Sequence, residues 1–373
     1  MARLWEVFAI KPSAYISGLC YSIFRLEPYT TCSLACTYCY ARWYRGPHGR
    51  PRPQPRVISI WTRLARRLEK LDYKPFFRLA TLSEPLQYAE KDWVASLTML
   101  QIALRHRIPV ILNTKSTLVL ASPWLDLILA LADQGLVLVQ VSLAFEDSTA
   151  AKLEPRAPPT SQRLEVIERL AEHGVPVVAR VQPLVPGLEH EHVKVAREAL
   201  EAGAQGLIGE SLRATQQDIQ HISKLLSIDL LSTTSWQPYQ LHQAPARQGL
   251  LHPNPHWRLH IHTTLQSLAT AYGKTYTACK EGIPPPPARD CCQATQHIKT
   301  PTMLRPTLYE LATLGLEDPL EACEKLGKPY TCSNNETLPK PVRKALKAHE
   351  ARLRRLARSK PHVQKLLLTD KPL

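Results

Sequence analysis

Short apolar runs alternate with amphipathic stretches from residue 21 to residue 212 of this 373-residue chain. The runs are rich in Val, Ile, Leu or Phe and have the length of a buried parallel strand. They lie at residues 21–26, 76–82, 110–112, 136–141, 177–181 and 206–208. The stretches between them have helical periodicity; residues 161–173 repeat apolar side chains along one face, and Gly174 follows as a stop. Strands that alternate with helices predict an α/β fold with a parallel sheet and right-handed crossovers.

Beyond residue 213 the alternation weakens, and helical patterns predominate at 257–272, 307–326 and 341–367. Four consecutive prolines at 284–287 exclude a helix or an inner strand at that point. The expected organisation is therefore an N-terminal segment, an α/β core, a mainly helical extension that contains cysteines, and a basic helical tail. Their expected ranges are 1–20, 21–215, 216–337 and 338–373.

The composition and the N-terminal residues indicate in which cell compartment the protein is expected. No uninterrupted apolar run reaches the ~18 residues that a membrane-spanning helix needs, so no contact with a membrane is expected. Glu6 lies where a signal peptide would need its apolar stretch, and nine cysteines without an export signal suit a reducing compartment. We therefore expect a cytoplasmic location.

The positive charge is clustered rather than spread. Of the formal net charge of +15, residues 41–56 contribute +5 and residues 340–360 contribute +8. Clusters of this kind favour an anionic partner such as a nucleic acid. For the C-terminal cluster, a solvated basic face is an equally good interpretation. Trp43 and Tyr44 lie among the first group of arginines, which suits stacking on unpaired bases or packing of that loop against the core.

The strongest candidate metal ligands are three closely spaced cysteines, Cys32, Cys36 and Cys39. Spacings of three and two intervening residues let three thiolates converge on one point. A [4Fe–4S] cluster normally takes four protein thiolates, so three ligands leave one iron open for chemistry. The same thiolates could hold zinc with a fourth ligand from elsewhere, or they could be unrelated buried or disulfide-forming residues.

The C-x3-C-x2-C pattern, followed by Tyr40, Ala41 and Arg42, resembles the radical S-adenosylmethionine superfamily. This resemblance implies a partial (β/α)6 radical SAM barrel with its active site at the C-terminal ends of the strands. It also implies a [4Fe–4S] cluster whose open iron binds S-adenosylmethionine (SAM), and an electron donor of the flavodoxin or ferredoxin type. One electron from the reduced cluster would break a C–S bond of SAM, and a 5′-deoxyadenosyl radical would abstract hydrogen from the substrate.

Within the superfamily, segments 29–42, 114–116, 153–158 and 183–187 are similar to the spore photoproduct lyase-like branch. That branch binds SAM through the tyrosines beside the third cysteine, serines after strands two and four, and a lysine after strand three. The resemblance assigns these roles to Tyr38, Tyr40, Ser83, Lys115 and Ser142. Thr81 stands where the true lyases carry a hydrogen-donating cysteine, so photoproduct lyase activity itself is not expected. The resemblance gives no catalytic residue.

Other polar residues have weaker patterns. The extension contains Cys279, Cys291, Cys292, Cys323 and Cys332, for which a second cluster, a zinc site, structural thiols and a disulfide are the alternatives. Glu210 and Arg213 follow the sixth strand and are expected to face the substrate. His256 and His260 share a helix face but are expected at the surface or in packing rather than on a metal.

The favoured function is a radical SAM enzyme that modifies or repairs an anionic substrate, with nucleic acid as the first candidate. A radical SAM enzyme that acts on a peptide or small molecule is the second interpretation. A metal-stabilised nucleic-acid-binding protein without catalysis is the third.

Overall fold

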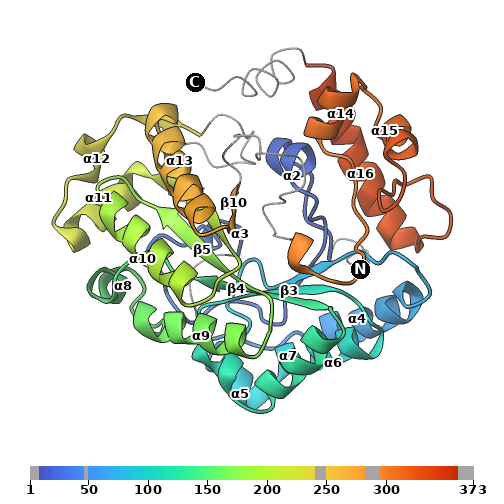
Figure 1. The fold of residues 1–373 in the computed structure, drawn as a ribbon, viewed down its shortest axis with the longest axis horizontal. Helices are drawn as coiled ribbons and strands as arrows, with labels where there is room; N and C mark the ends of the chain where they lie inside the picture. Colours follow the sequence, from blue (N-terminus) through green and yellow to red (C-terminus); the bar gives the residue numbers. More distant parts are fainter. Residues whose placement is uncertain (1–7, 46–48, 240–248, 280, 282–294, 360–373) are drawn as a thin grey trace.

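The computed structural model describes residues 8–45, 49–239, 249–279, 281 and 295–359 (Figure 1). Its centre is a parallel sheet of seven strands in the order β1-β2-β3-β4-β5-β6-β10. The strands are β1 Arg25–Leu26, β2 Phe77–Leu79, β3 Val110–Thr114, β4 Val137–Ser142, β5 Val177–Leu184, β6 Gly206–Ser211 and β10 Thr275–Ala278. The six predicted strands are confirmed in type and order, although the first is only two residues long.

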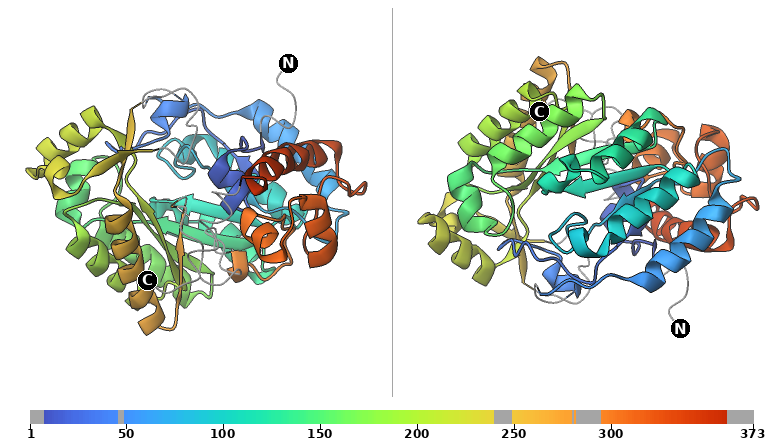
Figure 2. Two further views of the ribbon diagram at one scale, coloured as in Figure 1. Left: turned by 90° about the horizontal axis from the view of Figure 1, so that it is seen from above. Right: turned by 90° about the horizontal axis from the view of Figure 1, so that it is seen from below.

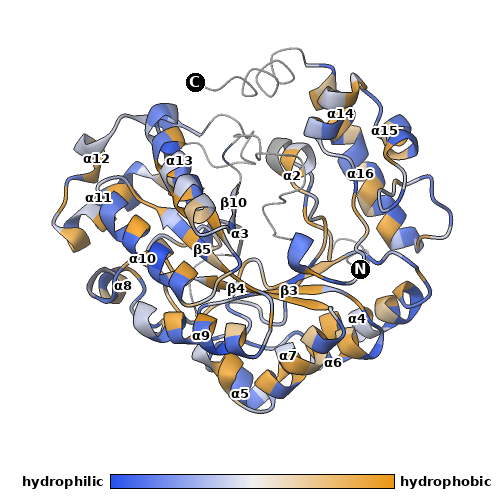
Figure 3. Cartoon of the chain, viewed as in Figure 1, coloured by the Kyte–Doolittle hydropathy of each residue, from blue (hydrophilic) through white to orange (hydrophobic). Residues whose placement is uncertain are grey.

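Helices cover the outer side of this curved sheet (Figure 1). The principal ones are α4 Pro55–Leu68, α6 Ala95–Arg105, α7 Trp124–Asp133, α9 Thr160–Glu172 and α10 Glu189–Glu201. Shorter elements lie in the connections: α3 Arg42–Arg45, α5 Glu90–Trp93, η1 Thr117–Leu120 and α8 Asp147–Leu153. The strands are apolar in Figure 3, as expected for a sheet whose outer face packs on helices.

Alternation along the strands divides the sheet into two faces. On β3, Val110 and Leu112 belong to the core beneath the helices, whereas Ile111 belongs to a separate cluster inside the barrel. That interior cluster includes Phe76, Ile111, Leu138, Val178 and Ile208. Two positions further along the same strands, the interior-facing residues are polar: Arg78, Asn113, Gln140, Arg180 and Glu210. The barrel thus has an apolar floor and a polar layer toward the C-terminal ends of its strands.

The seventh strand comes from the extension. After β7 Ala214–Thr215, the chain forms α11 Gln216–Leu226, α12 Leu230–Thr233, β8 Trp236–Pro238, β9 Leu250–Pro253 and α13 Pro255–Ala271. β7, β9 and β8 make a small antiparallel sheet, and β10 then pairs with β6. Gly209 allows this pairing, because a Cβ there would collide with Tyr276 of β10. A four-residue strand without a long apolar run gave no sequence signal.

The remaining helices form a separate cluster on the N-terminal segment. They are α14 Leu308–Leu314, α15 Pro319–Leu326 and α16 Lys340–Ala357, with α2 Ala14–Leu19 beside them (Figures 1 and 2); η2 Thr295–His297 precedes them. One predicted helix at 307–326 is in fact two, because Gly315 adopts a φ of 65° and ends the first. Nowhere in the described ranges is there a helix long and apolar enough to cross a membrane.

Candidate functional site

One pocket opens at the C-terminal ends of the strands, where sequence reasoning places the active site. The three motif cysteines and all five predicted SAM-binding residues line it. So do Thr81, Glu210 and Arg213. These lining residues are Cys32, Tyr38, Cys36, Cys39, Tyr40, Thr81, Ser83, Lys115, Ser142, Glu210 and Arg213. The fold therefore brings the named residues together, although they come from segments as far apart as β1 and β6.

Hydrogen bonds from two other segments hold the cysteine loop in place. The Gln87 side chain accepts a bond from Ser33 N at 2.9 Å and donates one to the Thr31 carbonyl at 3.0 Å. On the other side, Thr37 N donates to the Leu153 carbonyl at 2.9 Å. Between the first two cysteines, Ala35 has a φ of 54°, in the left-handed region that residues with a Cβ seldom adopt. A strained backbone that its surroundings enforce is typical of a functional loop.

Glu27 organises the loop that follows β2. Its carboxylate accepts hydrogen bonds from Thr81 N at 2.9 Å, Thr81 Oγ1 at 2.8 Å, Leu82 N at 3.1 Å and Ser83 Oγ at 3.3 Å. Glu27 is 5% exposed, so this set replaces the water that a buried carboxylate has lost. Thr81 and Ser83 are consequently fixed at the edge of the pocket. The threonine hydroxyl is committed to Glu27.

Glu154 is a buried charge centre beside the cysteine loop. Lys115 Nζ lies 2.8 Å from its Oε1, Arg163 Nη2 lies 2.6 Å from its Oε2, and the Tyr38 hydroxyl also donates to it. Burial alone would raise the pKa of this carboxyl, but the two cations and these hydrogen bonds lower the pKa to about 2. Lys115, one of the predicted SAM-binding residues, is thus already paired with a protein carboxylate.

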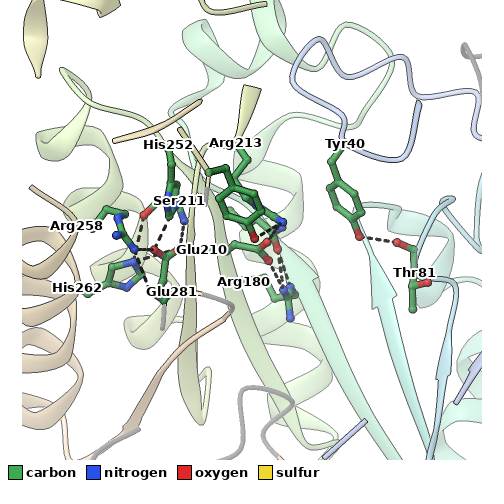
Figure 4. Close-up of polar contacts among 12 residues, drawn as sticks. Tyr40, Thr81, Arg180, Glu210, Ser211, Arg213, His252, Arg258, His262 and Glu281 are labelled. Atoms are coloured by element: carbon green, nitrogen blue, oxygen red, sulfur yellow. Dashed lines mark hydrogen bonds and ion pairs between the residues drawn. The ribbon is translucent and has the colours of Figure 1, made fainter. Parts of the chain in front are cut away.

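Tyr40, which also lines the pocket, has a different set of partners (Figure 4). Its hydroxyl donates to the Thr81 carbonyl at 2.6 Å, and the Arg213 guanidinium carbon lies 5.7 Å from its ring centre. Arg213 also lies over the Tyr239 ring at 5.2 Å and pairs with Glu210. The expectation that Glu210 and Arg213 face the substrate side of the pocket is compatible with this position, and their role stays a prediction.

The chemistry of the cysteines fits an iron–sulfur cluster. Burial raises the pKa of the Cys32 thiol to about 11, and it also raises the pKa of the Cys36 thiol. Thiolates in such a place need a compensating cation, which cluster irons supply as the protons leave. Among the described residues, no three His, Cys, Asp or Glu side chains stand close enough to hold a single metal ion. A cubane binds each thiolate on a separate iron, so its ligands do not share one ion.

Sequence reasoning missed several residues of the pocket region. Glu154 lies in a segment that resembles the lyase-like branch, yet no role followed from the resemblance. Glu27 gave no signal, because a single carboxylate after a short strand has no distinctive spacing. Arg78 was hidden inside the apolar run 76–82, where the alternating faces of a buried strand could have indicated it, and Asn113 directly follows the run 110–112 but was given no role.

The extension cysteines have different fates. Cys323 and Cys332 form a disulfide, so a metal site that includes this pair is wrong. Cys279 is buried beside the barrel floor, and Cys291 and Cys292 lie outside the described residues. His256 and His260 are exposed on α13, as expected.

A second buried network ties the extension to β6 (Figure 4). The Glu281 carboxylate accepts a hydrogen bond from Ser211 N at 2.7 Å and pairs with Arg258 at 3.1 Å. His252 and His262 lie 3.4 and 3.7 Å from it. Despite its burial, the two histidines hold the pKa of Glu281 well below its ordinary value. The network fixes the end of β6, which carries Glu210 and is followed by Arg213.

Comparison with known proteins gives matches in both sequence and fold. Residues 26–200 match the radical SAM superfamily. An uncharacterized protein of Acidianus two-tailed virus, ORF301, is 33% identical over 146 residues, which are 37% of this chain and 47% of that protein. The uncharacterized protein MJ0683 of Methanocaldococcus jannaschii is 26% identical over 168 residues, 44% of this chain and 61% of its own. The chain therefore spans about half the length of the curated relatives it matches.

Among solved structures, spore photoproduct lyase shares the fold. The complex with dinucleoside spore photoproduct has a TM-score of 0.54 at 16% identity, covering 69% of this chain and 76% of the lyase. A variant with bound AdoMet and dinucleoside spore photoproduct has a TM-score of 0.55 at 16% identity, covering 74% and 80%. The barrel, the cysteine motif and these matches together show a radical SAM domain over residues 26–200 and a spore photoproduct lyase-like fold.

Proposed function

We propose that this protein is a radical SAM enzyme that acts on an anionic substrate, with nucleic acid as the favoured class. Cys32, Cys36 and Cys39 would hold a [4Fe–4S] cluster through three of its irons. The single observation that supports this most strongly is that all three cysteines line one pocket with the predicted SAM-binding side chains. When bound, cluster and SAM supply one-electron cleavage of SAM to a radical that abstracts hydrogen from the substrate.

The protein side of this chemistry is binding and orientation. Tyr38, Tyr40, Ser83, Lys115 and Ser142 would contact SAM from four segments of the barrel. Because Glu154 already neutralises Lys115, we infer that lysine and glutamate act together. The ammonium would attract the SAM carboxylate while the buried Glu154 keeps the ammonium in place.

The substrate class rests on surface charge near the pocket. Arg50, Arg52 and Arg56 are exposed. Arg52 lies beside the cysteine loop, because Thr30 N donates to its carbonyl at 3.0 Å. We infer that side chains of this exposed segment contact phosphates of a substrate that enters the pocket. Arg42, in contrast, pairs with Asp218 at 2.5 Å and is less available.

We also propose an electron donor of the flavodoxin or ferredoxin type and a cytoplasmic location. The nine cysteines and the proposed iron–sulfur cluster support a reducing compartment. The disulfide between Cys323 and Cys332 is compatible with this location, because disulfides also occur in intracellular proteins of hyperthermophiles.

Anaerobic reconstitution with iron and sulfide tests the cluster. We expect a brown protein that forms 5′-deoxyadenosine from SAM and dithionite, and we expect Cys36→Ala to lose both properties. Cys20→Ala is the matched control, because Cys20 is a buried cysteine outside the pocket. Zinc without iron in the wild-type protein, or 5′-deoxyadenosine formation by Cys36→Ala, would refute the proposal.

Salt dependence of binding to single-stranded oligonucleotides tests the substrate class. Replacing Arg50, Arg52 and Arg56 with alanine should lower the slope of log affinity against log salt by about 2, since each phosphate contact contributes about 0.7. A slope that these substitutions leave unchanged would favour a peptide or small-molecule substrate instead.

A further inference from the structure

The polar layer of the barrel interior contains two arginines with contrasting surroundings. Arg180 on β5 is satisfied within the protein: its guanidinium donates to Gln140 Oε1 at 3.1 Å and to Gln182 Oε1 at 2.7 Å. Glu210 Oε2 lies 3.6 Å away and supplies a counter-charge. Arg180 is thus a buried cation of the usual kind, paired and hydrogen-bonded.

Arg78 on β2, in contrast, is a buried cation that lacks such partners among the described residues. Its side chain faces the barrel interior, lines the pocket and is only 8% exposed. Its Nε has no hydrogen-bond partner, and no carboxylate in the described ranges lies within ion-pair distance of its guanidinium. An unpaired charge in such a place costs several kcal/mol of folding free energy. A protein retains that cost most readily where a ligand supplies the missing counter-charge.

A second unsatisfied group lies on the neighbouring strand. Arg78 is registered with Ile111 of β3, so Asn113 is its diagonal neighbour, one step nearer the pocket mouth. The Asn113 amide nitrogen donates to the Ala80 carbonyl at 3.4 Å, which turns Oδ1 away from that carbonyl. Asn113 Oδ1 is itself buried and accepts no hydrogen bond from any residue that the structure describes. The wall therefore offers a cationic donor and, beside it, a free acceptor.

Arg78 lies deeper in the barrel than the residues that are expected to contact SAM. Ser83 and Lys115 follow their strands, and Ser142 is the last residue of β4, whereas Arg78 lies in the middle of β2. Directly beneath Arg78 on the same face is Phe76 of the apolar floor. A group that pairs with Arg78 must therefore reach below the strand ends, to the bottom of the pocket.

We propose that Arg78 and Asn113 form an oxyanion subsite for the substrate, deeper in the barrel than SAM. The guanidinium would bind a carboxylate or phosphate of the substrate through charge-assisted hydrogen bonds, and Asn113 Oδ1 would accept a bond from an adjacent hydroxyl, amine or amide. This inference rests on the proposed function and deepens it, since it places one charged end of the substrate. The rest of the substrate then extends toward the cysteines.

Thermal unfolding of the reconstituted, SAM-saturated holoenzyme during a titration with inorganic phosphate tests the subsite, with ionic strength held constant. In the wild-type protein, the midpoint temperature should rise to a plateau, because a ligand that binds only the native state stabilises it. Arg78→Met should weaken the apparent phosphate affinity by at least about tenfold, the size expected when charge-assisted hydrogen bonds to an anion are lost. Arg78→Lys should retain part of the response.

Arg67→Met is the matched control, because it removes the same charge from an exposed site on α4 that does not line the pocket. Its phosphate response should equal that of the wild-type protein. If Arg78→Met responds like Arg67→Met, phosphate is an adventitious ion only and the subsite is refuted. The unliganded Arg78→Met protein should itself melt at or above the wild-type temperature, because an apolar side chain replaces an unpaired buried cation. A clear fall in that temperature would also count against the proposal.

Two anions could pair with Arg78: the carboxylate of SAM and an anionic group of the substrate. A measurement of SAM affinity distinguishes them. A tenfold loss of SAM affinity in Arg78→Met, or a phosphate response that disappears once SAM is bound, would assign Arg78 to the SAM carboxylate and overturn a substrate subsite. Absence of a cluster or of 5′-deoxyadenosine would instead refute the proposed function. That failure would be visible in the reconstitution experiment, independently of the phosphate titration.

Discussion

Replacing Glu154 with glutamine should be strongly destabilising. The side chain is 1% exposed, and it joins the cysteine loop through Tyr38, the end of β3 through Lys115, and α9 through Arg163. Glutamine keeps the size of the side chain and removes its charge, which leaves two cations near the pocket without their shared counter-ion. Breaking a buried ion pair in this way typically costs about 3–5 kcal/mol.

The lowered pKa of Glu154 gives a second, independent value for the loss of unfolding free energy in Glu154→Gln. A fall from the ordinary 4.5 to about 2 in the folded protein corresponds to about 3 kcal/mol of stability near neutral pH. Both routes therefore place the effect of Glu154→Gln at roughly 3 kcal/mol.

The sign of the pH dependence follows from the direction of the shift. Because the pKa is lower in the folded state, the stabilisation is fully present above the unfolded value of 4.5 and is lost as pH falls toward 2. Between pH ~6 and ~3.5, the difference in unfolding free energy between the wild-type protein and Glu154→Gln should shrink by about 1.5 kcal/mol.

Urea unfolding of the cluster-free protein, followed by circular dichroism, measures this difference at each pH. Glu172→Gln is the control: Glu172 pairs with Arg169 at 2.9 Å, but both side chains are about half exposed. A surface pair of that kind contributes about 0–1 kcal/mol. The reasoning is wrong if Glu154→Gln costs no more than Glu172→Gln, or if its effect does not change between these pH values.

Three further predictions concern other parts of the molecule. Glu281→Gln should lower the unfolding free energy by about 3 kcal/mol, because it leaves buried cationic partners unpaired, and urea titration would show it. Tyr40→Phe should weaken SAM binding and cost about 1 kcal/mol of stability through the lost bond to the Thr81 carbonyl; unchanged SAM affinity by calorimetry would count against the assigned contact. Cys323→Ser should cost about 2.6 kcal/mol, as expected for a disulfide that closes a sequence separation of 9, and a reducing agent should have the same effect on the wild-type melting temperature but none on the variant.

Most of what could be predicted came from short-range patterns in the sequence. Hydrophobic runs located six strands, because a parallel strand that is buried on both faces is continuously apolar. The spacing of Cys32, Cys36 and Cys39 indicated their shared site, because three ligands from one loop need no information about distant chain segments. The resemblance added residues at the ends of three further strands, and the barrel brings these to the same pocket.

Long-range pairing decided what could not be predicted. β10 joins the sheet 64 positions after β6 ends because Gly209 leaves room for it, and such complementarity is not visible in a local window. The helix predicted at 307–326 divides because Gly315 caps the first part and Pro319 begins the second. The cysteines of the extension gave four alternatives, and only the spatial approach of Cys323 to Cys332 selected the disulfide for that pair.

The amino-acid sequence by itself determined the succession of the strands along the chain and the cysteine motif, and it carried the resemblance to the radical SAM superfamily. The strands follow from hydrophobic periodicity, and the motif follows from spacing along one short loop. Only the tertiary structure decided the charge pairing of the pocket: Lys115 is neutralised by Glu154, Arg180 by Glu210, and Arg78 by no described residue. The physical reason is that the energy of a buried charge depends on what lies within a few ångströms, and that neighbourhood is built from strands far apart in the chain.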